Sequence, residues 1–238
     1  MAEHPAPNDR AIDSGVPLWP LPLAIALTLT VAVHLAWVLS LHAGHVPPCI
    51  PYLEGCTSIS RAARHGLGNH LFRLLVLPCA LLVGMHWWLA ARWLRGEVAR
   101  GAGEARVILL LGVMAAIALA LYATFLGSEG TAYRFLRRYG VVVFFGTSYL
   151  AQLLFLRSAR GQGRLGPRMA RVMTAICIAM LALGVTNVVA DATMADAVRQ
   201  DRLENVLEWH LGVLLVAWYL AHAWVWRGSG YTLRLVRR

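Results

Sequence analysis

Residues 21–41 of the chain read LPLAIALTLTVAVHLAWVLSL, with one histidine and no formal charge. A helix needs about 20 mostly apolar residues to cross the hydrocarbon core of a bilayer. A cleaved signal peptide has a shorter apolar stretch and a basic leader, so this run predicts a retained membrane span. Residues 1–20 are polar and rich in proline, and predict a mobile tail in front of the first span.

Five more apolar runs of similar length follow the first. None shows the strict alternation of a membrane β-barrel, so each predicts a helix. The fold class we expect is therefore all-α, a polytopic bundle of six transmembrane helices in one domain from residue 21 to 226, with a basic tail at 227–238. The predicted spans are 21–41, 67–88, 107–126, 139–156, 172–190 and 206–226.

The composition agrees with a membrane protein. Of the 238 residues, 58% are hydrophobic and only 14% are charged, which is unusual for a soluble domain. The net charge of +10 comes from arginine alone, because the chain has no lysine. These arginines gather at the ends of apolar runs, so they indicate a membrane surface and no nucleic-acid partner.

The arginines also predict an orientation. Segments 92–106 and 157–171 carry four and five arginines, and four more follow from residue 227, whereas 190–208 is net acidic. Basic loops stay in the cytoplasm, so six spans place both termini there. The loop between the first two spans then lies on the outer side. The arginine-rich, lysine-free composition suggests a bacterial protein in the cytoplasmic membrane.

Tryptophans gather near the cytoplasmic ends of the second and sixth runs. Because tryptophan is enriched at membrane–water interfaces, this distribution predicts an interfacial belt. The residues concerned are Trp87, Trp88, Trp93, Trp224 and Trp226.

The outer loop holds two of the four cysteines, Cys49 and Cys56. Outside compartments are oxidising, so a local disulfide that closes a small loop is the favoured interpretation, with two free thiols as the alternative. Cys79 and Cys177 lie inside predicted spans and are expected to be packing residues.

Polar residues inside spans are costly and often functional. Arg73 and Glu208 lie at matching depth near the outer boundary, which suggests an ion pair or a shared network. The alternative is that both side chains reach the interface separately. Asn187 and Asp191 are four residues apart, so they share a helix face near the same boundary.

Several loops and spans therefore bring polar side chains to one depth. Arginines and hydroxyls there can hold an anionic lipid head group. Alternatively, acids and histidines can act on an activated hydroxyl, with Ser58 or Ser60 as nucleophile and His65, His70 or His210 as base. A solvated rim is the third interpretation. The convergent set is Thr57, Ser58, Ser60, Arg61, Arg64, His65, Asn69, His70, Arg73, Asn187, Asp191, Glu204, Glu208 and His210.

Histidines on the second and sixth runs raise the question of haem. His70 matches His210 in depth, and His86 matches His222, as in a pair of bis-histidine sites. However, at about 100° per residue the two histidines of each helix are roughly 160° and 120° apart, so one face cannot present both. No metal-ligand spacing appears either. We expect no cofactor and no metal.

The residues also resemble a known family. The run TSISRAARHG at residues 57–66, followed by an aromatic-Arg pair, is similar to the P-S-I-S-x-x-x-x-G element of DRAM/FRAG/SFK-type six-span proteins, which resemble the N-terminal domain of CWH-type proteins. Residues 204–226 resemble that family's last span, where a Glu-aromatic pair opens the helix and a histidine follows. The matched residues are Ser58, Ile59, Ser60, Gly66, Arg73, Glu208 and His222.

The family includes the factor that remodels the lipid of GPI anchors, so the resemblance implies lipid handling at the outer leaflet. The expected function is binding or remodelling of a membrane lipid, by acyl transfer or hydrolysis where it is catalytic. Its head group would be held by Arg61, Arg64, Arg73, Asn187, Asp191, Glu208, His210 and His222. The alternatives are a non-catalytic scaffold or regulator of a protein partner and, third, a haem electron carrier.

Overall fold

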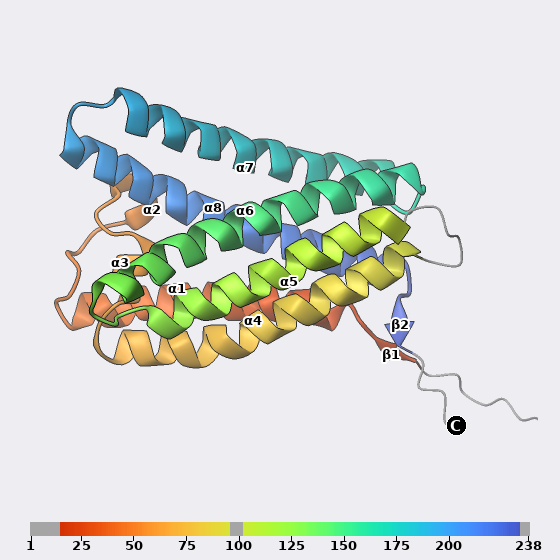
Figure 1. Cartoon of the computed structure of the whole chain (residues 1–238), viewed down its shortest axis with the longest axis horizontal. Helices are drawn as coiled ribbons and strands as arrows, with labels where there is room; N and C mark the ends of the chain where they lie inside the picture. Colours follow the sequence, from red (N-terminus) through yellow and green to blue (C-terminus); the bar gives the residue numbers. More distant parts are fainter. Residues whose placement is uncertain (1–14, 96–101, 234–238) are drawn as a thin grey trace, which may run out of the picture.

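The computed structural model describes residues 15–95 and 102–233, and most of them are helical. Two very short helices and two short strands accompany six long helices (Figure 1). The elements are β1 (Val16–Pro17), α1 (Pro20–His42), α2 (Pro51–Glu54), α3 (Ile59–Ala62), α4 (Gly66–Arg95), α5 (Ala102–Phe125), α6 (Thr131–Gly161), α7 (Pro167–Thr193), α8 (Ala197–Gly228) and β2 (Thr232–Leu233).

The six long helices are each long and apolar enough to cross a membrane. They confirm the predicted architecture of six transmembrane helices. The predicted spans fall within them, except that 107–126 runs one residue past the end of α5. The helices are longer than the apolar runs because polar and basic residues continue them at both ends, as in α6 and α8.

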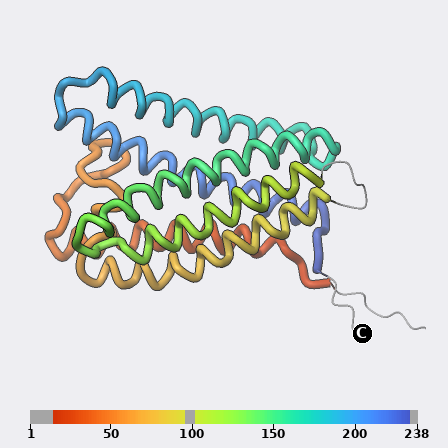
Figure 2. Tube along the Cα trace, in the orientation of Figure 1, coloured from red at the N-terminus to blue at the C-terminus, as the bar shows by residue number. Residues whose placement is uncertain are grey.

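The long helices run alternately up and down and pack in a ring whose order is α6, α5, α4, α1, α8, α7. We call the end that carries residues 43–65 the disulfide end, and the end where α1 begins and α8 finishes the terminal end. Figure 2 shows that α6 and α7 lie close at the terminal end and separate toward the disulfide end. The ring is therefore less tightly closed between α6 and α7 at the disulfide end.

Small residues let neighbouring helices approach closely, as is common in membrane bundles. Ala32 and Ala36 of α1 are fully buried against this core. On α5, a Cβ atom at Gly112 would lie 2.2 Å from the Trp87 side chain of α4. Glycine at this position is therefore what allows α5 to sit directly on the Trp87 indole.

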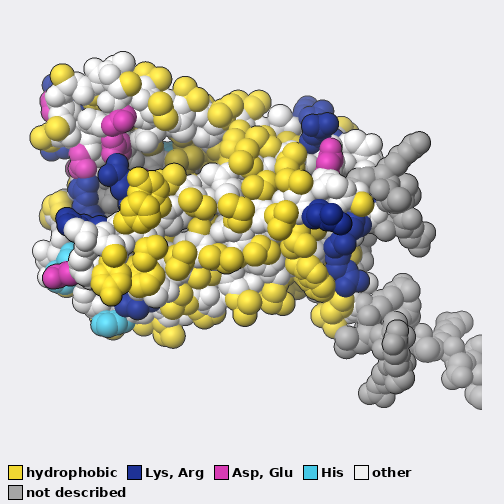
Figure 3. Space-filling model, viewed as in Figure 1, with side chains coloured by type: hydrophobic (Ala, Val, Ile, Leu, Met, Phe, Trp, Pro, Cys, Tyr) yellow, Lys and Arg dark blue, Asp and Glu magenta, His cyan; other side chains and the backbone are white. Residues whose placement is uncertain are grey.

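The outer surface of the ring is apolar along its middle. Large aliphatic side chains of several helices are more than half exposed there, among them Leu81, Ile117, Val142 and Val188. Figure 3 shows this apolar band with charged side chains gathered toward both ends. An exposed apolar belt of this kind indicates a surface that faces lipid.

The chain ends differ from the predicted tails. Val16 and Pro17 pair with Leu233 and Thr232 in a short antiparallel ladder, and Leu18 N–H donates to Tyr231 O at 3.1 Å. The segments 15–20 and 227–233 are thus joined to each other, although the sequence placed both in tails. The rest of those predicted tails, residues 1–14 and 234–238, lies outside the described residues.

The tryptophans also differ from the predicted belt. Trp88 and Trp224 are exposed at the surface, as an interfacial role requires. Trp87, Trp93 and Trp226 are buried in the core instead. Their position near helix ends matched a belt, but their direction around each helix points into the bundle.

Candidate functional site

The segment between α1 and α4 is closed by a disulfide between Cys49 and Cys56. Within it, Pro51 begins the single turn of α2, and Glu54 accepts a hydrogen bond from Ile50 N–H at 2.7 Å. The turn ends at Gly55, whose φ of 61° is in the left-handed region that favours glycine. The disulfide and the short turn together give this loop a defined shape.

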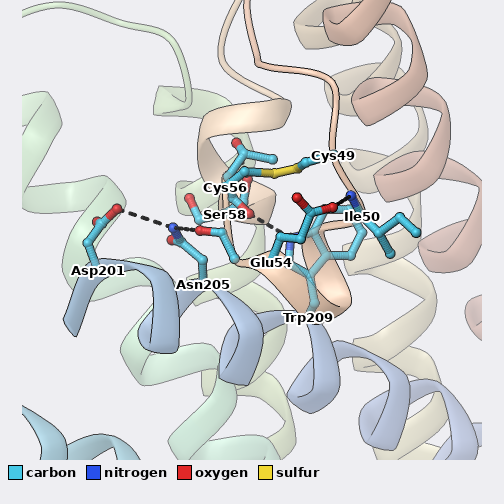
Figure 4. The surroundings of a disulfide bond; sticks show 10 residues. Cys49, Ile50, Glu54, Cys56, Ser58, Asp201, Asn205 and Trp209 are labelled. Carbon is cyan, nitrogen blue, oxygen red and sulfur yellow. Dashed lines mark hydrogen bonds between the residues drawn. A yellow bond between two sulfur atoms is a disulfide. The ribbon is translucent and has the colours of Figure 1, made fainter. Parts of the chain in front are cut away.

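This segment docks on the first turns of α8, as Figure 4 shows. Asn205 donates from Nδ2 to Gly55 O at 2.7 Å, and Trp209 donates from Nε1 to Thr57 O at 2.9 Å. A Cβ atom at Gly55 would lie 2.0 Å from Arg202 O, so only glycine permits this approach. These contacts hold the start of α3 against α8.

A cavity of about 360 Å³ lies beneath the docked segment. Its walls come from α1, α4, α5, α6 and α8, with Tyr52 of α2 and Ile59 of α3 at the disulfide end. Val213 lines the cavity and is 48% exposed. The lining is Leu29, Thr30, Val33, His34, Tyr52, Ile59, Phe72, Val76, Leu119, Tyr122, Val141, Phe144, Phe145, Glu208, Trp209, Gly212, Val213, Leu215 and Val216.

One polar group of the cavity joins α3, α5 and α8. Ser60 N–H donates to Glu208 Oε1 at 3.3 Å, and Ser60 Oγ shares a hydrogen bond of 2.9 Å with Tyr122 OH. Glu208 and Tyr122 both line the cavity. A carboxylate, a phenol and a serine hydroxyl therefore meet at one end of a largely apolar space.

A second polar group lies on the α1 side. His34 Nδ1 is 2.7 Å from Thr30 O, and its Nε2 is 2.8 Å from Tyr52 OH. A carbonyl can only accept, so Nδ1 carries a proton and donates to Thr30 O. Burial raises the pKa of Tyr52, so its hydroxyl stays protonated beside Nε2.

Three arginines surround the polar end of the cavity. Arg61 forms an ion pair with Asp201 of α8. Burial lowers the pKa of Arg64, and the nearby guanidiniums of Arg137 and Arg61 lower it further, while Tyr122 and Glu208 oppose them. Arg64 Nε is buried without a hydrogen-bond partner among the described residues. The cluster therefore has more positive charge than its carboxylates balance.

The predicted catalytic residues are not all brought together. Ser58 Oγ accepts from Arg61 N–H at 3.1 Å and caps α3, whereas Ser60 faces Tyr122. His65 is exposed in the turn before α4, and His70 is exposed on α4. His210 is exposed on α8, and its Nδ1 lies 2.8 Å from Val206 O. Within the described ranges, no histidine hydrogen-bonds to either serine.

Arg73 and Glu208 form no ion pair in the structure. The ion pairs among the described residues are Arg61–Asp201, Arg157–Glu104 and Arg199–Asp196. Phe72 and Val76 line the cavity. Arg73 follows Phe72 by one residue, or about 100° around α4, so it faces another direction. The predicted pairing of Arg73 with Glu208 is therefore not formed, and Ser60 takes the expected place beside Glu208.

Asn187 and Asp191 lie on the last turns of α7, away from the cavity lining. Asp191 Oδ1 accepts from Gln200 Nε2 at 2.8 Å, and the same amide donates to Glu204 at 2.9 Å. These contacts join the end of α7 to the start of α8. Both predicted head-group residues therefore stand outside the polar group around Glu208.

His222 is also separate from that group. It lies fourteen residues beyond Glu208 on α8, which is about 21 Å along the axis. Its ring packs against His86 with centroids 4.5 Å apart and an interplanar angle of 87°. We call His86, His222, Trp87, Tyr219, Phe155 and Trp226 the buried histidine cluster; all are fully buried, and each packs against one of the two imidazoles.

The haem interpretation does not fit this geometry. His86 and His222 do meet, as their matching depth predicted, but their rings touch edge to face and leave no space for a porphyrin between them. His70 and His210 are both exposed on the surface. Within residues 15–95 and 102–233, no group of three or more His, Cys, Asp or Glu side chains is arranged to hold a metal ion.

Four residues of the site were not selected from the sequence. Tyr122 and His34 sit in runs that otherwise predict only packing, and Tyr52 lies in the disulfide loop. Arg137 lies with Arg134 and Arg138 near the start of α6, at the end that the arginine count predicts to be outside. These arginines weaken that orientation slightly, because basic residues are less common on the outer side, and this was the one signal available for Arg137.

Comparison of the chain with protein-family models, curated proteins and solved structures finds no match.

Proposed function

We propose that this membrane protein binds a lipid in the cavity, with the lipid's polar head at the group around Glu208 and an apolar chain along the α4, α6 and α8 walls. The supporting observation is the polarity of the cavity itself. Its polar side chains gather toward the disulfide end, while Val76, Val141 and Val216 are among the apolar residues that line the rest. This arrangement suits an amphiphile.

The arginines favour a head group with negative charge. Arg64 is half-buried beside Arg61 and Arg137, and neither Arg64 nor Arg137 has a carboxylate within ion-pair distance among the described residues. Like charges held together at a partly buried site repel each other. A phosphate or similar anion would relieve that repulsion and take up the unpaired Arg64 Nε.

The arginine distribution supports an orientation in which the disulfide end lies outside, in the outer leaflet of a bacterial cytoplasmic membrane. The same chain segments, 57–66 and 204–226, carry the resemblance to DRAM/FRAG/SFK-type proteins. Ser60 and Glu208 are matched positions of that resemblance, and they are hydrogen-bonded here. We therefore propose membership of that group and lipid handling as the common theme.

A second candidate function, acyl transfer or hydrolysis of the bound lipid, rests on Ser60. Its hydroxyl hydrogen-bonds to Tyr122 OH at the cavity's polar end, whereas Ser58 is engaged as a helix cap. No described histidine contacts Ser60, so a base would have to be Glu208 or Tyr122. Binding is the function that the geometry supports best.

Native mass spectrometry of the detergent-purified protein, incubated with a membrane lipid extract, tests the proposal. Val141→Trp would fill the cavity from α6 and should abolish the retained lipid. Val142→Trp is the matched control, because Val142 is 61% exposed on the outer surface and should leave retention unchanged.

Equal retention in both tryptophan variants would refute binding in the cavity. Retention without preference among head groups would instead favour the role of a scaffold for a protein partner. Arg64→Ala addresses the head group: we expect it to reduce binding of anionic lipids more than of zwitterionic lipids.

A further inference from the structure

Two grooves lie side by side on α6 and α7 near the terminal end, far from the cavity described above. One has a volume of about 530 Å³ and the other about 350 Å³, and both are lined by Arg160 and Thr174. Arg160 Nη1 donates to Thr174 Oγ1 at 3.5 Å, so these two side chains form a ridge between the grooves.

Each groove is basic at its mouth and apolar beyond it. The larger one has Arg171 near the start of α7 and Ile178 two turns further toward the bundle's middle. The smaller one has Arg157 on α6, with Leu153 one turn deeper. At 1.5 Å per residue, Leu153 lies about 12 Å from the end of α6. Both grooves therefore run from the polar surface into the apolar band.

The charge around the mouths is strongly positive. Residues 157–171 carry five arginines and no carboxylate. Arg157 has a carboxylate, Glu104, at 3.7 Å, and Arg164 binds the Trp93 carbonyl. Arg171 has no ion-pair partner within the described part of the chain. An uncompensated basic surface next to the hydrocarbon attracts anionic lipid head groups.

We propose that this ridge is a second lipid site, which binds one anionic glycerophospholipid. The phosphate lies over Arg160 and is shared with Arg157 and Arg171, and one acyl chain enters each groove on either side of the Arg160–Thr174 ridge. A diacyl lipid fits two grooves that diverge from one basic point, whereas a single-chain amphiphile would fill only one. The site is independent of the cavity and of the function proposed for it.

Native mass spectrometry in the Val141→Trp background tests this site without the cavity lipid. The purified variant is incubated with phosphatidylglycerol or phosphatidylcholine in detergent. We expect bound phosphatidylglycerol to fall about tenfold or more in Arg160→Gln/Arg171→Gln, since each arginine near an anionic head contributes roughly a factor of five.

The control is Arg134→Gln/Arg138→Gln, which removes the same charge from exposed positions at the disulfide end. It should retain phosphatidylglycerol at the level of the background. An equal loss in both double variants, or none in Arg160→Gln/Arg171→Gln, would overturn the proposal, as would equal binding of phosphatidylcholine. Displacement of the lipid by glycerol phosphate would also overturn it, because the site would then bind a free phosphate without using the grooves.

Discussion

Glu208 and His222 lie on the same bundle-facing side of α8, yet they have opposite surroundings. Glu208 lines a cavity and is hydrogen-bonded to Ser60. His222 is fully buried and does not line the cavity. Its two ring nitrogens, like those of His86, have no hydrogen-bond partner among the described residues. The difference comes from the neighbours of α8. The short α3 turn faces α8 at the level of Glu208, whereas closely packed aromatic rings face it at the level of His222.

A polar residue inside a bundle therefore marks a site only where its neighbours leave it accessible. Around Glu208, the polar atoms have partners and open space beside them. In the buried histidine cluster, the polar atoms are enclosed by Trp87, Trp226 and Phe155. We interpret the first region as a binding site and the second as packing that joins α4 to α8.

The largest expected effect tests the packing role of the buried histidine cluster. His86→Ala should lower the free energy of unfolding by about 2–5 kcal/mol, because it leaves a cavity in a closely packed core. His86→Leu should cost far less, since it removes unpartnered polar atoms while keeping most of the volume. Denaturation in mixed detergent micelles measures both. A larger loss for leucine than for alanine would show that the imidazole itself is needed, and the contrast with Glu208 would fail.

The disulfide gives the next largest effect, confined to the other region. Cys49→Ser/Cys56→Ser should cost about 2 kcal/mol, from the loop-closure entropy of a short loop. We expect faster hydrogen exchange in residues 49–62 and weaker lipid retention, with the α4–α8 contact at His86 unchanged. Exchange mass spectrometry resolves the two regions, and equal acceleration in both would argue against their independence.

Glu208→Leu should separate binding from stability. Glu208 accepts a hydrogen bond from Ser60 N–H, and a hydrogen bond to a charged group contributes about 1.5–3 kcal/mol. Losing this contact should displace α3 at the polar end of the cavity and lower lipid retention about tenfold or more while the fold persists. Glu204→Leu is a matched control, because Glu204 lies one turn away and contacts Gln200 outside the cavity. Equal losses in the two variants would mean that retention does not depend on the contact between Glu208 and Ser60.

The smallest effect is expected from Ser60→Ala. Losing the hydrogen bond to Tyr122 should reduce lipid retention by about fivefold at most, corresponding to about 1 kcal/mol. The informative measurement is turnover of a radiolabelled phospholipid in proteoliposomes. Turnover that Ser60→Ala abolishes and Ser58→Ala preserves would assign acyl transfer or hydrolysis to Ser60. Turnover unaffected by Ser60→Ala would remove this residue as nucleophile.

The fold was predictable because membrane spans are encoded by uninterrupted apolar runs. Spans such as 21–41 need no knowledge of their neighbours, and the six helices confirm them. The residues at which the helices begin and end were harder to predict. For example, α8 begins with the charged segment 197–205, ahead of its apolar part. Caps and loop contacts, such as Asp196 accepting from Val198 N–H, determine these ends.

The site was predictable only in part. Ser60 and Glu208 were selected because a polar residue beside an apolar run is conspicuous. Tyr122 was not, because a tyrosine in an apolar helix usually packs. Depth along a helix can be counted from the sequence, but the direction of a side chain depends on which helices become neighbours. For this reason Arg73 was paired with Glu208, and His222 was placed with residues about 21 Å away.

The ring order has a consequence for how the protein is made. The first long helix, α1, packs against α8, the last, and β1 pairs with β2. The cavity takes walls from α1, α4, α5, α6 and α8. Insertion into the membrane proceeds from the first helix onward. The side of α1 that packs against α8 therefore has no helix neighbour until the final helix has been synthesised. The cavity is therefore complete only once α8 is in place, and a nascent chain that stops before α8 has five spans and lacks one wall of the cavity.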